Sequence, residues 1–275
     1  MGFSKGEKQR LKNKYGSWAL VTGASSGIGR ELAGRLAEAG INLVLTARRV
    51  SLLEDLAGDL QALYEVETFV IEADLTKQES IYALIKAVEN KDVGLLVATA
   101  GFGTSGLLIK SPLQEELDML QVNCAALLTL THYFAKKFAD RQRGGIILMS
   151  SMLGFHGAPF AAHYAATKAY VQSLGEALSV ELRKYGVDVL AAAPGPVQSG
   201  FADRANMRMG MTLKTSDVGI PILKALGRQS TVLPGCLTKF LVGSLRLLPR
   251  WGKVRVMRVV MGGMTQHHSS NNPIL

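Results

Sequence analysis

Cysteine, acidic residues and long apolar runs are all scarce in this chain. Its two cysteines, Cys124 and Cys236, lie far apart and show no metal-ligand spacing. We therefore predict no metal site and expect reduced thiols, in or near the core of a cytoplasmic protein. No apolar run reaches the ~18 residues that would predict a membrane-spanning helix. The basic segment 1–14 is not followed by an apolar stretch either, so we expect no secretory signal.

Acidic residues are outnumbered by basic ones, 22 against 31, which leaves a net charge of +9. Such a surplus suits a polyanionic partner: nucleic acid, an anionic membrane face or a multiply phosphorylated small molecule. No basic–aromatic platform or recognition motif for nucleic acid is present, so we expect no nucleic-acid partner. Hydrophobic residues make up 48% of the chain and charged ones 19%, which favours a compact α/β protein over a disordered one.

The chain opens with a strand, a glycine-rich turn, a helix and a second strand. An apolar strand at 18–22 leads into Gly23-Ala24-Ser25-Ser26-Gly27-Ile28-Gly29, and a strand at 42–47 follows the helix. Here Gly23 allows the tight turn, Gly27 lets the backbone approach a pyrophosphate, and Gly29 allows close helix packing. The unpaired N–H groups at the helix N-terminus favour an anion. The order predicts a dinucleotide-binding βαβ unit.

The end of the second strand lacks an acid. NAD-binding proteins usually place Asp or Glu there for the ribose 2′-hydroxyl, but no acidic residue occurs between Asn42 and Val50. Arg48 and Arg49 stand there instead, and a guanidinium suits a 2′-phosphate. The alternative is two solvated surface arginines. We predict NADP(H) as cofactor, with Arg48 as a contact.

The alternation of helices and strands continues along the chain. Helices are expected at 51–63, 77–90, 113–139 and 163–185, and strands at 67–72, 93–98, 145–150 and 187–193. A small-residue turn at 99–103 leaves room for a cofactor. No linker, repeat or low-complexity tract interrupts the pattern. We predict an α/β protein: a three-layer, doubly wound Rossmann fold with a central parallel sheet of about seven strands and a C-terminal helical extension.

Tyr164 and Lys168 lie four residues apart and so share one helix face. A nearby ammonium favours the phenolate, which would lower the tyrosine pKa toward a range useful for acid–base chemistry. The pair alone is a common pattern, but Ser151 ends a predicted strand, where ligands bind in open parallel sheets. Together these residues indicate a candidate active site.

With these motifs in place, the chain resembles the short-chain dehydrogenase/reductase family over about residues 15–235. The glycine-rich turn is similar to the family's cofactor turn, and Ser151 precedes Tyr164 by the family spacing. Asp74 matches the acid that touches adenine, and Asn123 the asparagine that interrupts a long helix. One difference is Ala98-Thr99-Ala100-Gly101, where the family usually has Asn-Asn-Ala-Gly; the amides that brace the sheet are missing.

The resemblance implies roles for individual residues. Tyr164 would be the general acid in reduction or the base in oxidation, and Lys168 would lower its pKa and hold the nicotinamide ribose. Ser151 would bond the substrate oxygen, and Asn123 would hold a water that relays protons from Lys168. The expected cofactor contacts are Gly23, Ser25, Ser26, Gly27, Ile28, Gly29, Arg48, Asp74, Leu75, Ala100, Gly101, Tyr164, Lys168, Pro194, Gly195 and Val197.

The segment after Pro196 is expected to form a mobile substrate cover. Phe201 and Met207, Met209 and Met211 would give it an adaptable apolar wall, or would simply fill gaps in the core. The resemblance is nearest to reductases of 3-ketoacyl chains and hydroxysteroids, which favours a hydrophobic carbonyl substrate. His156 and His163 are interpreted as pocket or packing residues. The long helices resemble the faces by which the family forms homodimers and homotetramers.

Four segments are expected: a polar, basic lead-in at 1–16, the catalytic domain at 17–235, a basic amphipathic extension at 236–264 and a disordered tail at 265–275. The extension carries six cations and no acid, and Pro249 divides it into two helical pieces. This composition is typical of an element at a membrane interface, which would make a cytoplasmic protein peripheral to a membrane. The alternative is an arm that covers the substrate cleft or a partner subunit.

The predicted function is NADP(H)-dependent transfer of hydride between the nicotinamide and a carbonyl or secondary alcohol, on an acyl, steroid-like or other lipid-like substrate. The competing hypothesis is a non-catalytic NADP(H)-binding protein that acts in redox-responsive interactions. The two differ over Asn123, Ser151, Tyr164 and Lys168, because a protein that only binds the cofactor does not require all four.

Overall fold

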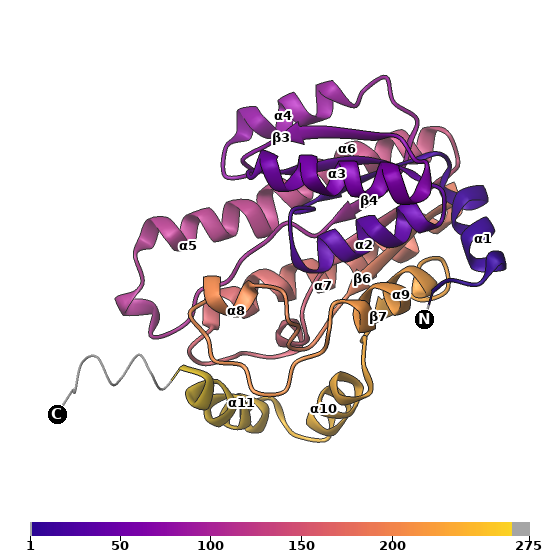
Figure 1. The fold of residues 1–275 in the computed structure, drawn as a ribbon. Coiled ribbons are helices and arrows are strands. Elements are labelled where there is room, and N and C mark those ends of the chain that lie inside the picture. The colour runs from indigo at the N-terminus through magenta and orange to yellow at the C-terminus, as the bar shows by residue number, and fades with distance from the viewer. Residues whose placement is uncertain (1, 266–275) are drawn as a thin grey trace.

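The computed structural model describes residues 2–265, apart from the side chain of Arg246. Seven parallel strands form one sheet in the order β3-β2-β1-β4-β5-β6-β7 (Figure 1). Their bounds are β1 Trp18–Thr22, β2 Asn42–Ala47, β3 Thr68–Glu72, β4 Val93–Ala98, β5 Gly144–Met149, β6 Val187–Ala192 and β7 Thr231–Val232. The strand order reverses between β1 and β4, where ligands bind in doubly wound sheets.

Helices cover both faces of the sheet and enclose two apolar cores. Successive strand residues face opposite layers: Ala19 and Val21 of β1 belong to one core, and Leu20 belongs to the other. The first core is covered by α1 Lys5–Tyr15, α2 Gly27–Glu38, α3 Val50–Tyr64 and α9 Ser216–Ala225; the second is covered by α4 Gln78–Ala87, α6 Leu127–Asp140 and α7 Ala162–Glu181. The prediction of a three-layer, doubly wound α/β fold is confirmed.

The lead-in at 1–16, expected only to be polar and basic, contains helix α1. Its Leu11 and Tyr15 are fully buried. The Tyr15 hydroxyl donates to Asp188 Oδ2 at 2.7 Å, and its ring lies against Gly145 of β5. These two residues, four positions apart, lie on one face of the helix. Arg10 adds hydrogen bonds to the carbonyls of Leu226 at 2.9 Å and Leu223 at 2.8 Å.

The predicted long helix at 113–139 is divided in two. Helix α5 Leu113–Leu120 passes through a π-helical turn, Gln121–Ala126, into α6. This turn contains Asn123, whose side chain is completely buried. Such turns often mark functional sites, and here the turn displaces Asn123 toward the loop that follows β4.

The C-terminal extension forms helices α10 Cys236–Arg246 and α11 Arg250–Thr265, separated at Pro249 as predicted. Both lie below the sheet in Figure 1, with α11 beneath the short helix α8 Phe201–Arg204. Cys236 is exposed at the start of α10, so the expectation of a core or near-core position was wrong for this thiol. Among the described residues no helix has both the length and the apolar character needed to cross a membrane.

The tail predicted at 265–275 lies outside the described residues except for Thr265. That residue is buried at the end of α11, where its hydroxyl donates to the Met261 carbonyl at 2.9 Å.

Candidate active site

A cavity of about 580 Å³ lies at the carboxyl ends of the parallel strands. All of the predicted cofactor contacts line it, from Gly23 to Val197, and so do Ser151, Tyr164 and Lys168. These residues come from the carboxyl ends of six different strands and from helix α7, and only the fold brings them together. Asn123 is the exception, because it lies behind the cavity wall.

The glycine-rich turn forms one end of the cavity. Gly27 has a φ of +58° and begins α2, and a Cβ at Gly29 would lie 2.4 Å from the Gly23 carbonyl oxygen. A side chain at Gly29 would therefore separate the helix from the turn. The Ser26 side chain caps none of the first N–H groups of α2, so these donors remain available to an anion.

Two arginines line the same end of the cavity. Both Arg48 and Arg49 are exposed. Arg49 Nη2 donates to the hydroxyls of Ser25 at 3.1 Å and Ser26 at 3.0 Å, which ties this guanidinium to the glycine-rich turn. Arg49 was not among the predicted contacts, although its place next to Arg48 was a usable signal.

The missing family amides are partly replaced by Thr99. Its hydroxyl donates to the Thr22 carbonyl at the end of β1, and the Ala100 N–H donates to the Thr22 hydroxyl at 3.1 Å. Sequence reasoning did not foresee this brace between β1 and β4. Its effect is to hold Ala100 and Gly101 against the glycine-rich turn.

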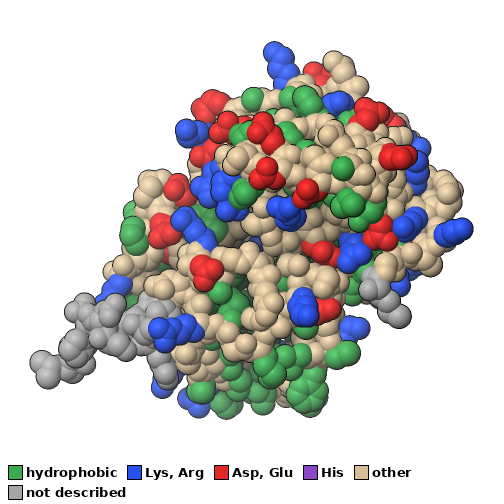
Figure 2. Space-filling model, in the orientation of Figure 1, with side chains coloured by type: hydrophobic (Ala, Val, Ile, Leu, Met, Phe, Trp, Pro, Cys, Tyr) green, Lys and Arg blue, Asp and Glu red, His purple; other side chains and the backbone are tan. Residues whose placement is uncertain are grey.

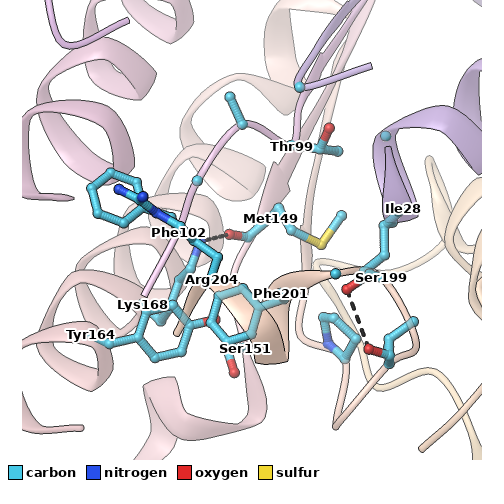
Figure 3. Close-up of a pocket in the computed structure, with 18 of the residues that line it drawn as sticks. Ile28, Thr99, Phe102, Met149, Ser151, Tyr164, Lys168, Ser199, Phe201 and Arg204 are labelled. Atoms are coloured by element: carbon cyan, nitrogen blue, oxygen red, sulfur yellow. Dashed lines mark hydrogen bonds between the residues drawn. The ribbon is translucent and has the colours of Figure 1, made fainter. Parts of the chain in front are cut away.

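Tyr164, Lys168 and Ser151 meet at the centre of the cavity (Figure 3). The Lys168 ammonium lies 5.7 Å from the centroid of the Tyr164 ring and donates to the Met149 carbonyl at 2.8 Å. Ser151 Oγ accepts from the Leu153 N–H at 3.2 Å, which fixes the hydroxyl at the end of β5. Helix α7 thus brings the two titratable groups to the strand that carries the serine.

Burial changes the pKa values of both titratable groups in the cofactor-free chain. It raises the pKa of Tyr164 to about 12, although a hydrogen bond with the Ser151 side chain opposes the shift. It lowers the pKa of Lys168 to about 8. The expected lowering of the tyrosine pKa by the lysine is therefore not present in the chain alone, because desolvation outweighs any attraction between the two groups.

Asn123 lies directly behind the lysine. A Cβ at Gly101 would lie 2.8 Å from Asn123 Oδ1 and 3.3 Å from Lys168 Nζ. Both groups are therefore packed closely against this glycine. Asn123 Oδ1 accepts from the Phe102 N–H, and Nδ2 donates to the Phe102 carbonyl and the Thr167 hydroxyl. The side chain is thus occupied in holding the loop after β4.

The wall opposite Tyr164 is largely apolar, although Arg204 also lines the cavity. The Phe201 ring lies 5.1 Å from that of Tyr164 (Figure 3), and Met207 and Met209 also line the cavity. Met211 does not: it is 76% exposed, so its expected place in the wall was wrong.

Helix α11 completes this wall. Its Met257, Met261 and Met264 line the cavity beside Leu241 of α10. The extension was interpreted either as an element at a membrane interface or as an arm over the substrate cleft. The contacts show that its inner side covers the cleft. Its outer side makes none of these contacts. Sequence periodicity could show that these helices are amphipathic, but not which side faces the catalytic residues.

His156 and His163 pack against neighbouring side chains and do not face the cavity. His163 Nδ1 lies 2.6 Å from the buried Glu116 Oε2. Burial opposes ionisation of Glu116, but hydrogen bonds, first from Ser111 and then from His163, lower its pKa. His156 is buried, and burial lowers its pKa, helped by the nearby charge of Lys253. Neither histidine lines the cavity.

Comparison with known proteins agrees with this geometry. Residues 17–209 match the family model for short chain dehydrogenase. The chain is 34% identical to a 7beta-hydroxysteroid dehydrogenase of Collinsella aerofaciens over 65% of this chain and 68% of that one. It is 36% identical to a very-long-chain 3-oxoacyl-CoA reductase of Pyrenophora tritici-repentis over 63% of this chain and 53% of that one, so it spans about half of the fungal protein.

Solved structures show the same likeness. A 7beta-hydroxysteroid dehydrogenase superposes with a TM-score of 0.84 at 28% identity, over 90% of this chain and 98% of that chain. A short-chain dehydrogenase from Sphingobium yanoikuyae in complex with NADPH superposes with a TM-score of 0.75 at 27% identity, over 85% and 97%. The chain therefore belongs to the short chain dehydrogenase family, whose members bind a nicotinamide cofactor, and it is an oxidoreductase that acts on a carbonyl group or the corresponding alcohol.

Proposed function

We propose that this oxidoreductase uses NADP(H) and acts on a ketone or secondary alcohol carried by a steroid-like or long acyl skeleton. One observation carries the proposal: the cavity has a cationic, glycine-lined end and an apolar end, and Tyr164 lies between them. The names of the bacterial hydroxysteroid dehydrogenase and the fungal 3-oxoacyl-CoA reductase support a hydrophobic substrate.

The residues at the cationic end fit a phosphorylated dinucleotide. The N-terminus of α2 would hold the pyrophosphate, Arg48 and Arg49 the 2′-phosphate, and Asp74 the adenine. The glycines leave a cradle that side chains would fill, and no acid competes with the arginines at the end of β2. When bound, the nicotinamide supplies or accepts the hydride.

Tyr164 would exchange the proton at the substrate oxygen. The phenol is protonated at neutral pH, so it has the proton that a general acid gives in the direction of reduction. A pKa of about 12 is too high for efficient transfer, so the bound cofactor would have to lower it. Ser151 Oγ would hold the same oxygen, and Lys168 would bond the nicotinamide ribose and assist the phenol. Asn123 would support the proton path indirectly, through the loop that carries Gly101 and Phe102.

We further propose a homodimer or homotetramer, formed through α5 and α7. Both helices expose large apolar side chains, among them Leu113 at 72% and Val180 at 71%. The proposed location is the cytoplasm, with peripheral contact to a membrane through the C-terminal extension.

The test of the proposed function is NADPH oxidation at 340 nm with a panel of carbonyls: 3-ketoacyl thioesters, ketosteroids, quinones and small aldehydes. NADH and the Tyr164→Phe protein run in parallel. We expect turnover that requires NADPH and falls at least about 10³-fold in Tyr164→Phe, because the proton donor is lost. NADPH affinity should fall at most about tenfold in this variant, because the phenol adds at most one neutral hydrogen bond to the cofactor.

The competing hypothesis, a protein that binds NADP(H) without chemistry, predicts tight binding and no Tyr164-dependent turnover on any carbonyl class. Family membership and the meeting of Ser151, Tyr164 and Lys168 at one point favour the enzyme. Turnover that survives Tyr164→Phe unchanged would contradict the role proposed for the phenol.

A further inference from the structure

The outer side of the C-terminal extension exposes large apolar side chains that cover nothing in the described protein. Phe240 is 71% exposed, Trp251 64% and Val259 75%. Val256 and Val260 of α11 are also exposed, as are Leu247 and Leu248 in the connection between the two helices. Figure 2 shows hydrophobic side chains gathered along the lower edge of the molecule, over α10 and α11. We call this surface the α10–α11 face.

The charge of the α10–α11 face has one sign. Residues 236–265 contain no Asp or Glu. In the described part of the chain, its basic side chains form no ion pair within 4 Å: Lys239, Arg250, Lys253, Arg255 and Arg258. Several cations elsewhere form such pairs, for example Arg35 with Glu31 and Glu38. The α10–α11 face therefore presents apolar side chains together with uncompensated positive charge.

The inner side of the same helix lines the active-site cavity. Met257 and Met261 are buried there, while Val259 points outward, and Val260 both lines the cavity and is 42% exposed. Only the thickness of α11 separates the apolar end of the cavity from the α10–α11 face. Whatever covers that face is therefore adjacent to the substrate.

We propose that the α10–α11 face docks onto a bilayer of anionic phospholipid, and that an apolar ketone passes from the bilayer beside α11 into the cavity. Exposed Trp, Phe and Val side chains would enter the headgroup region while the basic side chains bind lipid phosphates. A second copy of the same face is disfavoured, because it would bring like charges together. The docking stands on the surface alone, whereas the substrate route rests on the proposed function.

Trp251 offers a direct reporter of docking. The only other tryptophan is Trp18, whose ring lies under the Lys91 ammonium at 4.3 Å. The Trp18→Phe protein, full-length and without cofactor or substrate, is titrated with vesicles of phosphatidylglycerol or of phosphatidylcholine alone. We expect a blue shift of Trp251 emission and co-sedimentation with the anionic vesicles, both weakened when salt rises from 0.1 to 1 M, as screening requires.

Two matched pairs of variants test which surface binds. Arg255→Gln with Arg258→Gln should weaken binding about 25-fold, at about fivefold for each basic residue near the surface. Lys86→Gln with Lys136→Gln removes the same charge from exposed positions on α4 and α6 and should change binding less than about threefold. Phe240→Ser should weaken binding, whereas Leu63→Ser, at a similarly exposed position on α3, should not.

Several results would overturn the docking proposal. These are absence of binding, equal binding to both vesicle types, or equal losses in the matched pairs. Concentration-dependent self-association that Arg255→Gln, Arg258→Gln and Phe240→Ser change would assign the face to a second copy. Binding of an acidic amphipathic peptide in preference to vesicles would assign it to a protein partner.

The substrate route is tested by kinetics. An apolar ketone dissolved in anionic vesicles should turn over at least about fivefold faster than in phosphatidylcholine vesicles, and Arg255→Gln with Arg258→Gln should remove this difference. The same variant should reduce a short, water-soluble ketone at the wild-type rate. An advantage that survives in the variant overturns the route. Loss of turnover on every ketone, with docking intact, would instead count against the proposed function.

Discussion

The phenol of Tyr164 is buried together with the ammonium of Lys168, and burial acts on the two groups in opposite directions. It raises the pKa of Tyr164 to about 12 and lowers that of Lys168 to about 8. In the cofactor-free chain, therefore, both groups shift toward their neutral forms. The sequence pattern predicts the pair but not this balance, because the pattern contains no information about desolvation.

Lys168 should make stability depend on pH in a defined window. A lysine in the unfolded chain titrates near ~10.4, whereas the folded pKa is about 8. Between these values the unfolded chain holds the extra proton, so the free energy of unfolding rises with pH. We expect the Tm of the wild-type protein, relative to that of Lys168→Met, to increase from pH 7.5 to pH 10. Differential scanning fluorimetry without cofactor measures both values. Parallel curves would show that the lysine keeps its ordinary pKa.

Arg48 and Arg49 should decide the choice of cofactor. Replacing either by Ala should weaken NADPH binding by about 1.5–3 kcal/mol, the usual value of a hydrogen bond to a charged group, and leave NADH nearly unchanged. Isothermal titration of both cofactors measures this difference. Arg30→Ala is the control, since Arg30 is half-buried, its Nη2 lies 3.4 Å from Asp59 Oδ2, and it does not line the cavity. Equal loss for NADPH and NADH would contradict the assignment to a 2′-phosphate.

Helix α1 was not predicted from the sequence. The strands and the glycine-rich turn follow from apolar runs and fixed glycine positions, whereas α1 has only two fully buried side chains, Leu11 and Tyr15, in a polar sequence. No periodicity stands out from so few residues. The helix is held to the sheet by the ring of Tyr15, which fills the space that Gly145 leaves, and by hydrogen bonds from Arg10 to two distant carbonyls. A local pattern cannot report such long-range contacts.

Tyr15 should therefore hold α1 to the sheet. Tyr15→Ala should lower the free energy of unfolding by about 3–5 kcal/mol, as for other buried aromatic residues. Tyr15→Phe should cost only about 0.5–1.5 kcal/mol, because it removes one hydrogen bond while Asp188 keeps its contact with Lys14 at 2.6 Å. Urea denaturation measures both. A cost below about 1 kcal/mol for Tyr15→Ala would mean that α1 contributes little to the folded state.

For the molecule as a whole, the proposed oligomer rests on the outer face of α5 and α7. Leu120 and Tyr170 are exposed there and line a small apolar groove. A lysine at position 120 would place a charge in that interface, so Leu120→Lys should lower the molecular mass seen in analytical ultracentrifugation while NADPH binding persists. Leu63→Lys, on the exposed side of α3, is the matched control. An unchanged mass for Leu120→Lys would exclude this face.

The tertiary arrangement of the cavity was the part least accessible to the sequence. The motifs placed Tyr164, Lys168 and the glycine-rich turn correctly in one cavity, since each has a fixed position relative to a strand end. The residues of α11 that form the wall have no fixed position relative to a strand end. The methionines of α11 recur with helical spacing, which predicts a buried side but not what that side covers.

The segment 197–201 spans both ends of the cavity. A Cβ at Gly27 would lie 2.8 Å from the Cβ of Ser199, while the Phe201 ring rests on Tyr164 (Figure 3). One stretch of backbone thus covers the turn that would hold the pyrophosphate and the position of the reacting carbonyl. If the proposed cofactor binds beneath this segment, we expect a compulsory order, in which NADPH enters first and NADP⁺ leaves last. Product inhibition should then show NADP⁺ competing with NADPH, and the alcohol product not competing with it.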